Sequence, residues 1–178
     1  MTALPTDPDI AGDGIRLRRW RPDDVTPLTD AWQDPELQRR FAVADVTHAS
    51  IESFVRDATR AWENGTAAML AVVDTGSGTV VGGCDLSELD GDGPADVGYW
   101  VAAARRGEGI ARRAVTALVE WAGRELHRTE FVLELEADNV ASVGVARALG
   151  FAPDGSERVD TTGTSPRTLM RHRLARAS

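Results

Sequence analysis

The chain has 178 residues, enough for one domain with its own hydrophobic core, and its 42% apolar and 27% charged residues are ordinary for a globular protein. A formal net charge of −8 argues against a domain-wide basic surface for nucleic acid, and no apolar run approaches the roughly 20 residues that span a bilayer. One cysteine, three scattered histidines and the absence of lysine exclude an internal disulfide, a typical zinc spacing and lysine-based chemistry.

The first half of the chain predicts a strand, helices and a hairpin, in that order. Residues 15–20 alternate apolar and charged side chains as a half-buried strand does, and a short helix is expected over 25–33. Asp34-Pro35 ends that helix, and a second short turn follows as far as residue 39. Apolar positions three and four residues apart predict a helix over 50–63, with Trp62 in the core. Strands are expected at 69–74 and 80–86, joined by a glycine-containing turn.

The second half predicts an alternation of strands and helices. A strand over 95–102 precedes the clearest helix, 110–125, which places Trp121 on its apolar face. A strand over 131–136, a helix from Asn139 to 149 ended by Gly150, and a hairpin of 156–160 with 168–174 follow. The economical interpretation is a single α/β domain over residues 1–178 with a central mixed sheet.

The N-terminal segment and the cysteine indicate where the protein is found. Residues 1–13 carry three aspartates and no basic residue, unlike a signal peptide. The lone Cys84 suits a reducing compartment and is interpreted as a core residue. We therefore expect a cytoplasmic protein without membrane or nucleic-acid partners, whose acidic surface favours cationic substrates.

The loop between the strand at 95–102 and the helix at 110–125 carries the strongest chemical signal. Gly107 and Gly109 allow a tight turn that exposes consecutive N–H groups, and the following helix adds its positive N-terminal end. These features, with four flanking arginines, predict a phosphate or pyrophosphate site; the arginines are Arg105, Arg106, Arg112 and Arg113. A plain strand-to-helix turn is the alternative. A dinucleotide loop is excluded because Arg112 stands at the third glycine position.

Four segments carry a resemblance to a known family. Residues 106–111, Arg-Gly-Glu-Gly-Ile-Ala, resemble the Q/R-x-x-G-x-G/A signature of the GNAT superfamily of N-acetyltransferases, which wraps the pyrophosphate of coenzyme A. Residues 95–101 (Ala-Asp-Val-Gly-Tyr-Trp-Val), 139–151 and 15–24 resemble segments of its RimJ/RimL-type branch, in the same order. The resemblance covers nearly the whole chain.

The resemblance implies a GNAT fold: a mixed, mostly antiparallel sheet of six to seven strands flanked by about four helices. Its fourth and fifth strands, 95–102 and 131–136, would splay apart and hold acetyl-CoA between them, without a metal. The backbone of the fourth strand would bind the pantetheine arm, the glycine loop the pyrophosphate, and one helix-capping residue the pantetheine side. The pantetheine-binding strand residues would be Tyr99, Trp100 and Val101. The pyrophosphate loop would be Arg106, Gly107, Glu108, Gly109, Ile110, Ala111 and Arg112. The helix-capping residue is Asn139, whose alternative role is the cap alone.

The resemblance also implies direct attack of an amine on the thioester, which needs a base and a proton donor. Glu134 is the first candidate for the base, with an outward-facing strand carboxylate as its alternative, and Asp96 is the second. Many members use a tyrosine as the acid, but Ala146 stands at that position. Ser142 is the substitute that RimL-type members suggest, with a capping or packing hydroxyl as the alternative.

Three functions remain open from the sequence. The leading hypothesis is acetylation of a protein N-terminal α-amine; the second is acetylation of a small amine such as an antibiotic, a polyamine or an amino-acid derivative. The third is a non-catalytic acyl-CoA-binding module. Acceptor specificity is expected from the helices within residues 25–63 and from the C-terminal hairpin, and both a monomer and a homodimer are compatible with the sequence.

Overall fold

The computed structural model describes residues 4–5, 8–43, 45–162 and 166–176, which form an eight-stranded sheet with helices on both faces. The strand order is β1-β2-β3-β4-β5-β6-β8-β7, and only the β5–β6 pairing is parallel. The strands are β1 (Ile10–Gly12), β2 (Ile15–Arg19), β3 (Ala68–Asp74), β4 (Val80–Ser87), β5 (Ala95–Val101), β6 (Glu130–Glu136), β7 (Ala152–Asp160) and β8 (Arg167–Ala175). The helices are α1 (Val25–Ala31), α2 (Pro35–Phe41), α3 (His48–Asn64), α4 (Ile110–Glu125) and α5 (Val140–Ala148).

This architecture confirms the mixed, mostly antiparallel sheet and adds two elements to it. The strand β1 is only three residues long and pairs with β2, and so short a segment shows no alternation in the sequence. The helix α2 forms where only a turn was expected. Pro35 begins it, and the Asp34 carboxylate accepts the Glu36 N–H at 2.9 Å, so Asp34-Pro35 starts a helix as well as ending one. The splayed strands are therefore the fifth and sixth.

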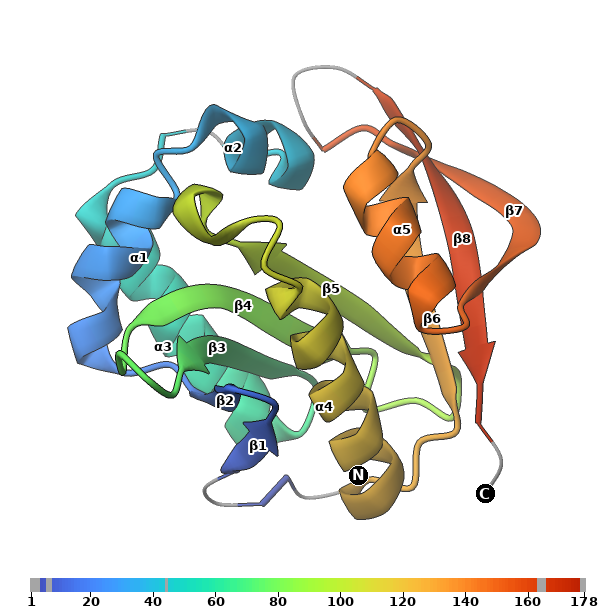
Figure 1. The fold of residues 1–178 in the computed structure, drawn as a ribbon, viewed down its shortest axis with the longest axis horizontal. Coiled ribbons are helices and arrows are strands. Elements are labelled where there is room, and N and C mark those ends of the chain that lie inside the picture. Colours follow the sequence, from blue (N-terminus) through green and yellow to red (C-terminus); the bar gives the residue numbers. More distant parts are fainter. Residues whose placement is uncertain (1–3, 6–7, 44, 163–165, 177–178) are drawn as a thin grey trace.

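The gap between β5 and β6 divides the sheet into two parts. Only Ala95 with Phe131 and Asp96 with Val132 are in register, although each strand has seven residues. Beyond these pairs the strands diverge, while β6 stays paired with β8 along its full length (Figure 1). The predicted splay is confirmed.

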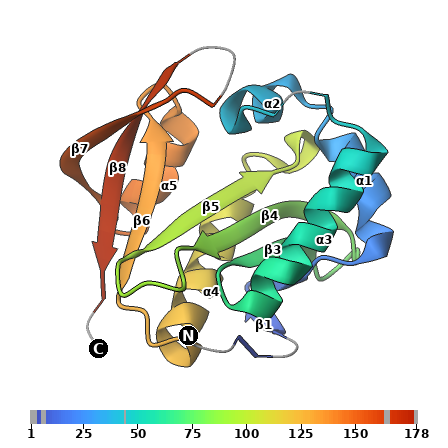
Figure 2. The same ribbon diagram turned by 180° about the vertical axis from the view of Figure 1, so that it is seen from behind.

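Helices cover the two faces unequally. The helices α4 and α5 lie on one face, and α1 and α3 lie on the other (Figures 1 and 2). One apolar cluster joins the sheet to α4 and includes Leu118 and Phe131, both fully buried. The second cluster, under α1 and α3, includes Leu28 and Trp100. Packing on both faces fixes the positions of β5 and β6, and therefore the shape of the gap.

Candidate functional site

A cavity of about 540 Å³ opens where β5 and β6 diverge. Its walls come from β5, β6, the glycine loop before α4, the first turns of α5, and α2. The size is within the range of small-molecule sites, which lie preferentially where elements separate. Residues far apart in the sequence therefore meet around one concave surface.

The β5 edge of the cavity exposes backbone groups. The Ala102 N–H donates to the Val81 carbonyl on the β4 side at 2.9 Å, so alternate peptide groups, those of Val101 and Tyr99, face the gap. Trp100 directs its carbonyl toward Gly82 of β4. Its ring contacts those of Trp20 and Trp32 on the other face of the sheet. Of the three backbone candidates, Tyr99 and Val101 can pair with an extended ligand as an added strand does.

The glycine loop has the backbone conformation that its sequence suggests. Gly107 and Gly109 have φ angles of +82° and +73°, the left-handed region that favours glycine, and no atom lies within 4 Å of a Cβ built on either. Gly109 is the N-cap of α4, and buried Ile110 anchors the helix to the core while Ala111 lines the cavity. Glu108, in contrast, is exposed, does not line the cavity, and receives hydrogen bonds from Arg105.

The four arginines of the loop differ in the ion pairs and hydrogen bonds that their side chains make. Arg112 lines the cavity and makes no ion pair with any residue that the structure describes. Arg106 lines it too, but pairs with the Asp34 carboxylate and donates to the Val101 carbonyl at 3.3 Å. Arg105 pairs with Glu108 and Asp74. Arg113 points elsewhere, donating to the backbone carbonyls of Asp13 and Glu108, so three of the four predicted cations lie at the cavity.

The carboxylate candidates share one face of the sheet. Leu133 and Leu135 point into the core under α4, so Glu134 points to the opposite face, where it lines the cavity. The Arg158 Nε donates to it at 2.9 Å. Asp96 lies on the same face of β5, and burial, followed by the nearby charge of Glu134, raises the pKa of its carboxyl group.

Asp85 is a further acidic residue on this face and was missed by the sequence interpretation. It sits opposite Gly98 in the β4–β5 register, and its carboxylate oxygen lies 2.6 Å from where a Cβ on Gly98 would be. Gly98 therefore leaves the space that the carboxylate fills. Burial, followed by the charge of Asp96, raises the pKa of Asp85 to about 6. The available signal was an aspartate within an otherwise apolar run, Val80 to Leu86.

The α5 side of the cavity carries the hydroxyl groups. The Asn139 carboxamide oxygen accepts the Ser142 N–H at 3.2 Å, which is the helix-cap role considered for it, and both residues line the cavity. Tyr99 of β5 lines it as well. Ala146 is fully buried, so the position at which many family members carry a tyrosine belongs to the core here.

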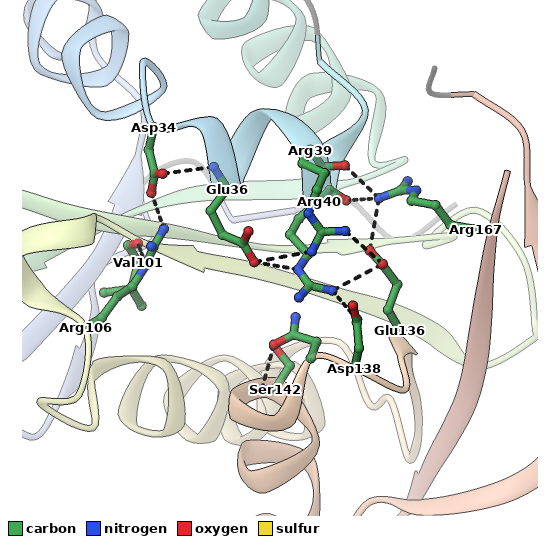
Figure 3. Close-up of polar contacts among 11 residues, drawn as sticks. Asp34, Glu36, Arg39, Arg40, Val101, Arg106, Glu136, Asp138, Ser142 and Arg167 are labelled. Carbon is green, nitrogen blue, oxygen red and sulfur yellow. Dashed lines mark hydrogen bonds and ion pairs between the residues drawn. The ribbon is translucent and has the colours of Figure 1, made fainter. Parts of the chain in front are cut away.

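The helix α2 lies across the open end of the gap and is held there by ion pairs (Figures 1 and 3). Arg40 donates to Glu36 at 2.8 Å and to Asp138 at 2.7 Å, and lies 3.2 Å from Glu136 of β6. Arg167 of β8 donates to the Arg39 carbonyl at 3.1 Å. We call these residues the α2 network: Glu36, Arg39, Arg40, Glu136, Asp138 and Arg167. The sequence predicts acceptor specificity from the helices within residues 25–63 and from the C-terminal hairpin, but it does not identify the ion pairs that join them.

Among the residues that the structure describes, no three or more His, Cys, Asp or Glu side chains gather as a metal site. No described helix is both long enough and apolar enough to cross a membrane.

A sheet opened between two strands, with a glycine loop and a helix N-terminus at the opening, is the architecture of an acyl-CoA-dependent acetyltransferase. The chain belongs to the acetyltransferase (GNAT) domain family, whose model matches residues 15–152. A curated relative, the uncharacterized N-acetyltransferase p20 of Bacillus licheniformis, is 23% identical over 79% of this chain and 80% of its own.

Two solved structures show the same fold. RimL, a ribosomal L7/L12 α-N-protein acetyltransferase solved with coenzyme A, has a TM-score of 0.78 and 20% identity over 94% of this chain and 98% of its own. The microcin C7 self-immunity acetyltransferase MccE, solved with acetyl-CoA and AMP, has a TM-score of 0.83 and 18% identity over 98% of this chain and 99% of its own. At these identities the two likenesses show that this chain shares their fold.

Proposed function

We propose that this protein transfers the acetyl group of acetyl-CoA to a primary amine held in the cavity between β5 and β6. The observation that carries the proposal is the geometry of the gap: the β5 edge that faces the gap, the positive-φ glycine loop and Arg112, which makes no ion pair with the described residues, border one cavity. Bound structures of RimL and MccE, with coenzyme A and acetyl-CoA respectively, support this choice of donor.

The residues of the cavity fit such a donor in chemical type. The N–H groups of residues 107–112 and the α4 N-terminus suit the pyrophosphate, with Arg106 and Arg112 as cations. The peptide groups of Tyr99 and Val101 suit the pantetheine amides, and Asn139 stands at their side. The donor supplies an activated acetyl thioester; the chain's own residues position it and move protons.

Two carboxylates support the proposed removal of the amine proton. Glu134 remains the first candidate because its carboxylate lines the cavity. Asp96 is the second; it is not among the residues that line the cavity, but it lies on the face of Glu134, and its raised pKa makes its carboxylate a stronger base. An α-amine has a pKa near 8, so most of the acceptor is protonated at neutral pH and one proton must leave before attack.

The acceptor that we propose is a protein N-terminal α-amine. The support is the resemblance to RimL, whose described substrate is a ribosomal protein, together with the acidic face formed by Asp85, Asp96 and Glu134, of which Glu134 lines the cavity and would attract a cation. The second candidate is a small amine, which the complex of MccE with AMP favours because a small molecule is bound by a protein of this fold. The α2 network closes one side of the cavity and would decide which of the two enters.

The test is release of free thiol from acetyl-CoA in the presence of a panel of amines. The panel holds peptides with free N-termini, the same peptides with blocked N-termini, polyamines and aminoacyl nucleotide analogues. Turnover with free but not blocked peptides is the expected result. Turnover confined to small amines would establish the second candidate. Coenzyme A binding without any turnover would identify a non-catalytic acyl-CoA-binding module.

A further inference from the structure

Tyr99 is the only tyrosine of the chain, and β5 places it on the α5 side of the cavity. Side chains alternate along the strand, so Tyr99 shares the face of Val97 and packs against the core under α4 and α5. Ser142, in the first turn of α5, lines the same cavity. Two residues that carry hydroxyl groups, from two different elements, therefore line the same cavity.

The Tyr99 hydroxyl oxygen is buried and has no hydrogen-bond partner that meets normal geometry among the residues that the structure describes. Leaving a hydroxyl buried and unsatisfied is unfavourable, so a phenylalanine here would be the more stable choice. Burial raises the pKa of Tyr99, and interaction with the Ser142 side chain opposes that effect in part. The phenol thus keeps its proton at neutral pH and remains available as a donor.

We propose that Tyr99 is the catalytic acid of the transfer, and that Ser142 connects its hydroxyl to solvent. The inference rests on the proposed function and deepens it by naming the group that protonates the leaving sulfur. Ala146, fully buried, stands where many family members carry a tyrosine, so this chain has no phenol at that position. A phenol supplied from β5 replaces one supplied from α5.

The protons of the step balance as follows. The ammonium group of the acceptor loses one proton to the carboxylates of the acidic face, and the neutral nitrogen attacks the thioester carbonyl carbon to give a tetrahedral intermediate. As the carbon–sulfur bond breaks, its electron pair stays with sulfur, and the Tyr99 hydroxyl gives that sulfur its proton. The nitrogen loses its second proton to solvent, the carboxylate releases the first proton to solvent, and the phenolate regains a proton from solvent by way of the Ser142 hydroxyl. The products are the amide, the free thiol and one proton, with all three side chains restored.

The first experiment uses the lone tyrosine as its own reporter. Tyrosinate absorbance in the near ultraviolet, followed against pH, titrates Tyr99 alone because no other tyrosine is present. We expect the pKa of Tyr99 to shift when coenzyme A binds, and not to shift with desulfo-coenzyme A, which binds the same loop but lacks the thiol. Equal titrations with the two ligands would overturn the proposal.

The second experiment separates the two hydroxyl groups by kinetics. Tyr99→Phe removes one buried oxygen for which the described residues provide no hydrogen bond of normal geometry, so the variant should fold and bind coenzyme A as the wild type does. We expect its kcat to fall by about 10²-fold with an unchanged KM for acetyl-CoA. Ser142→Ala, the matched control, should lose less. Wild-type turnover by Tyr99→Phe, or a severe loss confined to Ser142→Ala, would show that Tyr99 is not the acid.

Failure of the proposed function would be recognised separately. A wild-type protein that does not bind coenzyme A, measured by calorimetry before any variant is made, overturns the proposed donor and the role of Tyr99 together. A wild-type protein that binds and turns over, with Tyr99→Phe unimpaired, overturns the role of Tyr99 alone.

Discussion

Gly109 takes a backbone conformation that other residues adopt only at a cost, and it does so at the mouth of the cavity. Its φ is +73°, and no atom would contact an added Cβ within the protein itself. Gly109→Val should therefore fold with some local strain while placing a branched side chain at the proposed pyrophosphate site. We expect coenzyme A affinity, measured by calorimetry, to fall at least about tenfold, or about 1.4 kcal/mol.

Gly78 provides the matched control for this substitution. It has φ +71° in the β3–β4 turn, does not line the cavity, and has no atom within 4 Å of an added Cβ. Gly78→Val should carry the same backbone cost and leave coenzyme A affinity unchanged. If both variants bind coenzyme A with the affinity of the wild type, the pyrophosphate does not bind at this loop.

The candidate base is tested by paired substitutions that keep the size of the side chain. Glu134→Gln should lower kcat by about 10²–10⁴-fold with coenzyme A affinity nearly intact, and should abolish or displace the rise of kcat with pH. Asp96→Asn should then have a small effect. If Glu134→Gln keeps wild-type turnover, Glu134 serves only as the partner of Arg158, and a large loss in Asp96→Asn would assign the base to Asp96.

Asp85 makes stability depend on pH in a direction opposite to that of a salt-bridged carboxylate. Its pKa in the folded protein, about 6, is raised above the ordinary 3.8 by burial, so the folded state binds this proton more tightly than the unfolded chain. The proton on Asp85 therefore contributes at most about 3 kcal/mol to the free energy of unfolding. This contribution is fully present below about pH 4 and is lost as pH rises through 6. We expect Asp85→Asn to exceed the wild type in urea stability at pH 7.5 and to match it at pH 4. A difference that is the same at both pH values would contradict this account.

At the scale of elements, α2 owes its position to charge rather than to a large apolar face. Leu37 is its buried residue, whereas the α2 network ties its end to β6 and β8 (Figure 3). Arg40→Met keeps the length of the side chain and removes the cation shared by Glu36, Glu136 and Asp138. Because Arg40 is mostly buried, we expect a loss of about 1–3 kcal/mol and a raised KM for the acceptor, with KM for acetyl-CoA unchanged.

An exposed arginine on another helix provides the matched control for Arg40→Met. Arg60 on α3 pairs with Asp57 at 3.4 Å, but its side chain is 72% exposed. Arg60→Met should change stability by less than about 0.5 kcal/mol and leave both KM values unchanged. An Arg40→Met variant that behaves like Arg60→Met would show that α2 does not shape the acceptor side of the cavity.

At the scale of the whole molecule, two tryptophans join helices that cover opposite faces of the sheet. Trp62 of α3 and Trp121 of α4 are buried, as predicted, and their ring centroids lie 6.0 Å apart in a stacked arrangement. Trp121→Ala should lower the free energy of unfolding by about 3–5 kcal/mol, measured by urea titration. Glu120→Ala, at the exposed neighbouring position, should change it by less than about 0.5 kcal/mol. A Trp121→Ala variant as stable as the wild type would contradict the stacking role.

Local patterns were enough for most elements and for the two core tryptophans. Helix α4 begins and ends where the spacing of Ile110, Ala114, Leu118 and Ala122 indicated, because a helix that packs on a sheet must repeat its apolar face. The Asn139 cap and the positive φ of Gly109 and Gly150 likewise follow from residue type. Short elements were harder: a three-residue strand or a seven-residue helix offers too few positions for a period to appear.

The sequence by itself determined the family, the order of the elements and the glycine loop, since each depends on residues close together in the chain. The tertiary structure decided which candidates share a surface. It turned Arg113 and Glu108 away from the cavity, brought Asp85 onto the face of Asp96 and Glu134, and placed the Tyr99 hydroxyl beside α5. Such relations depend on strand register and on where two strands separate, and these are set by packing between segments distant in sequence.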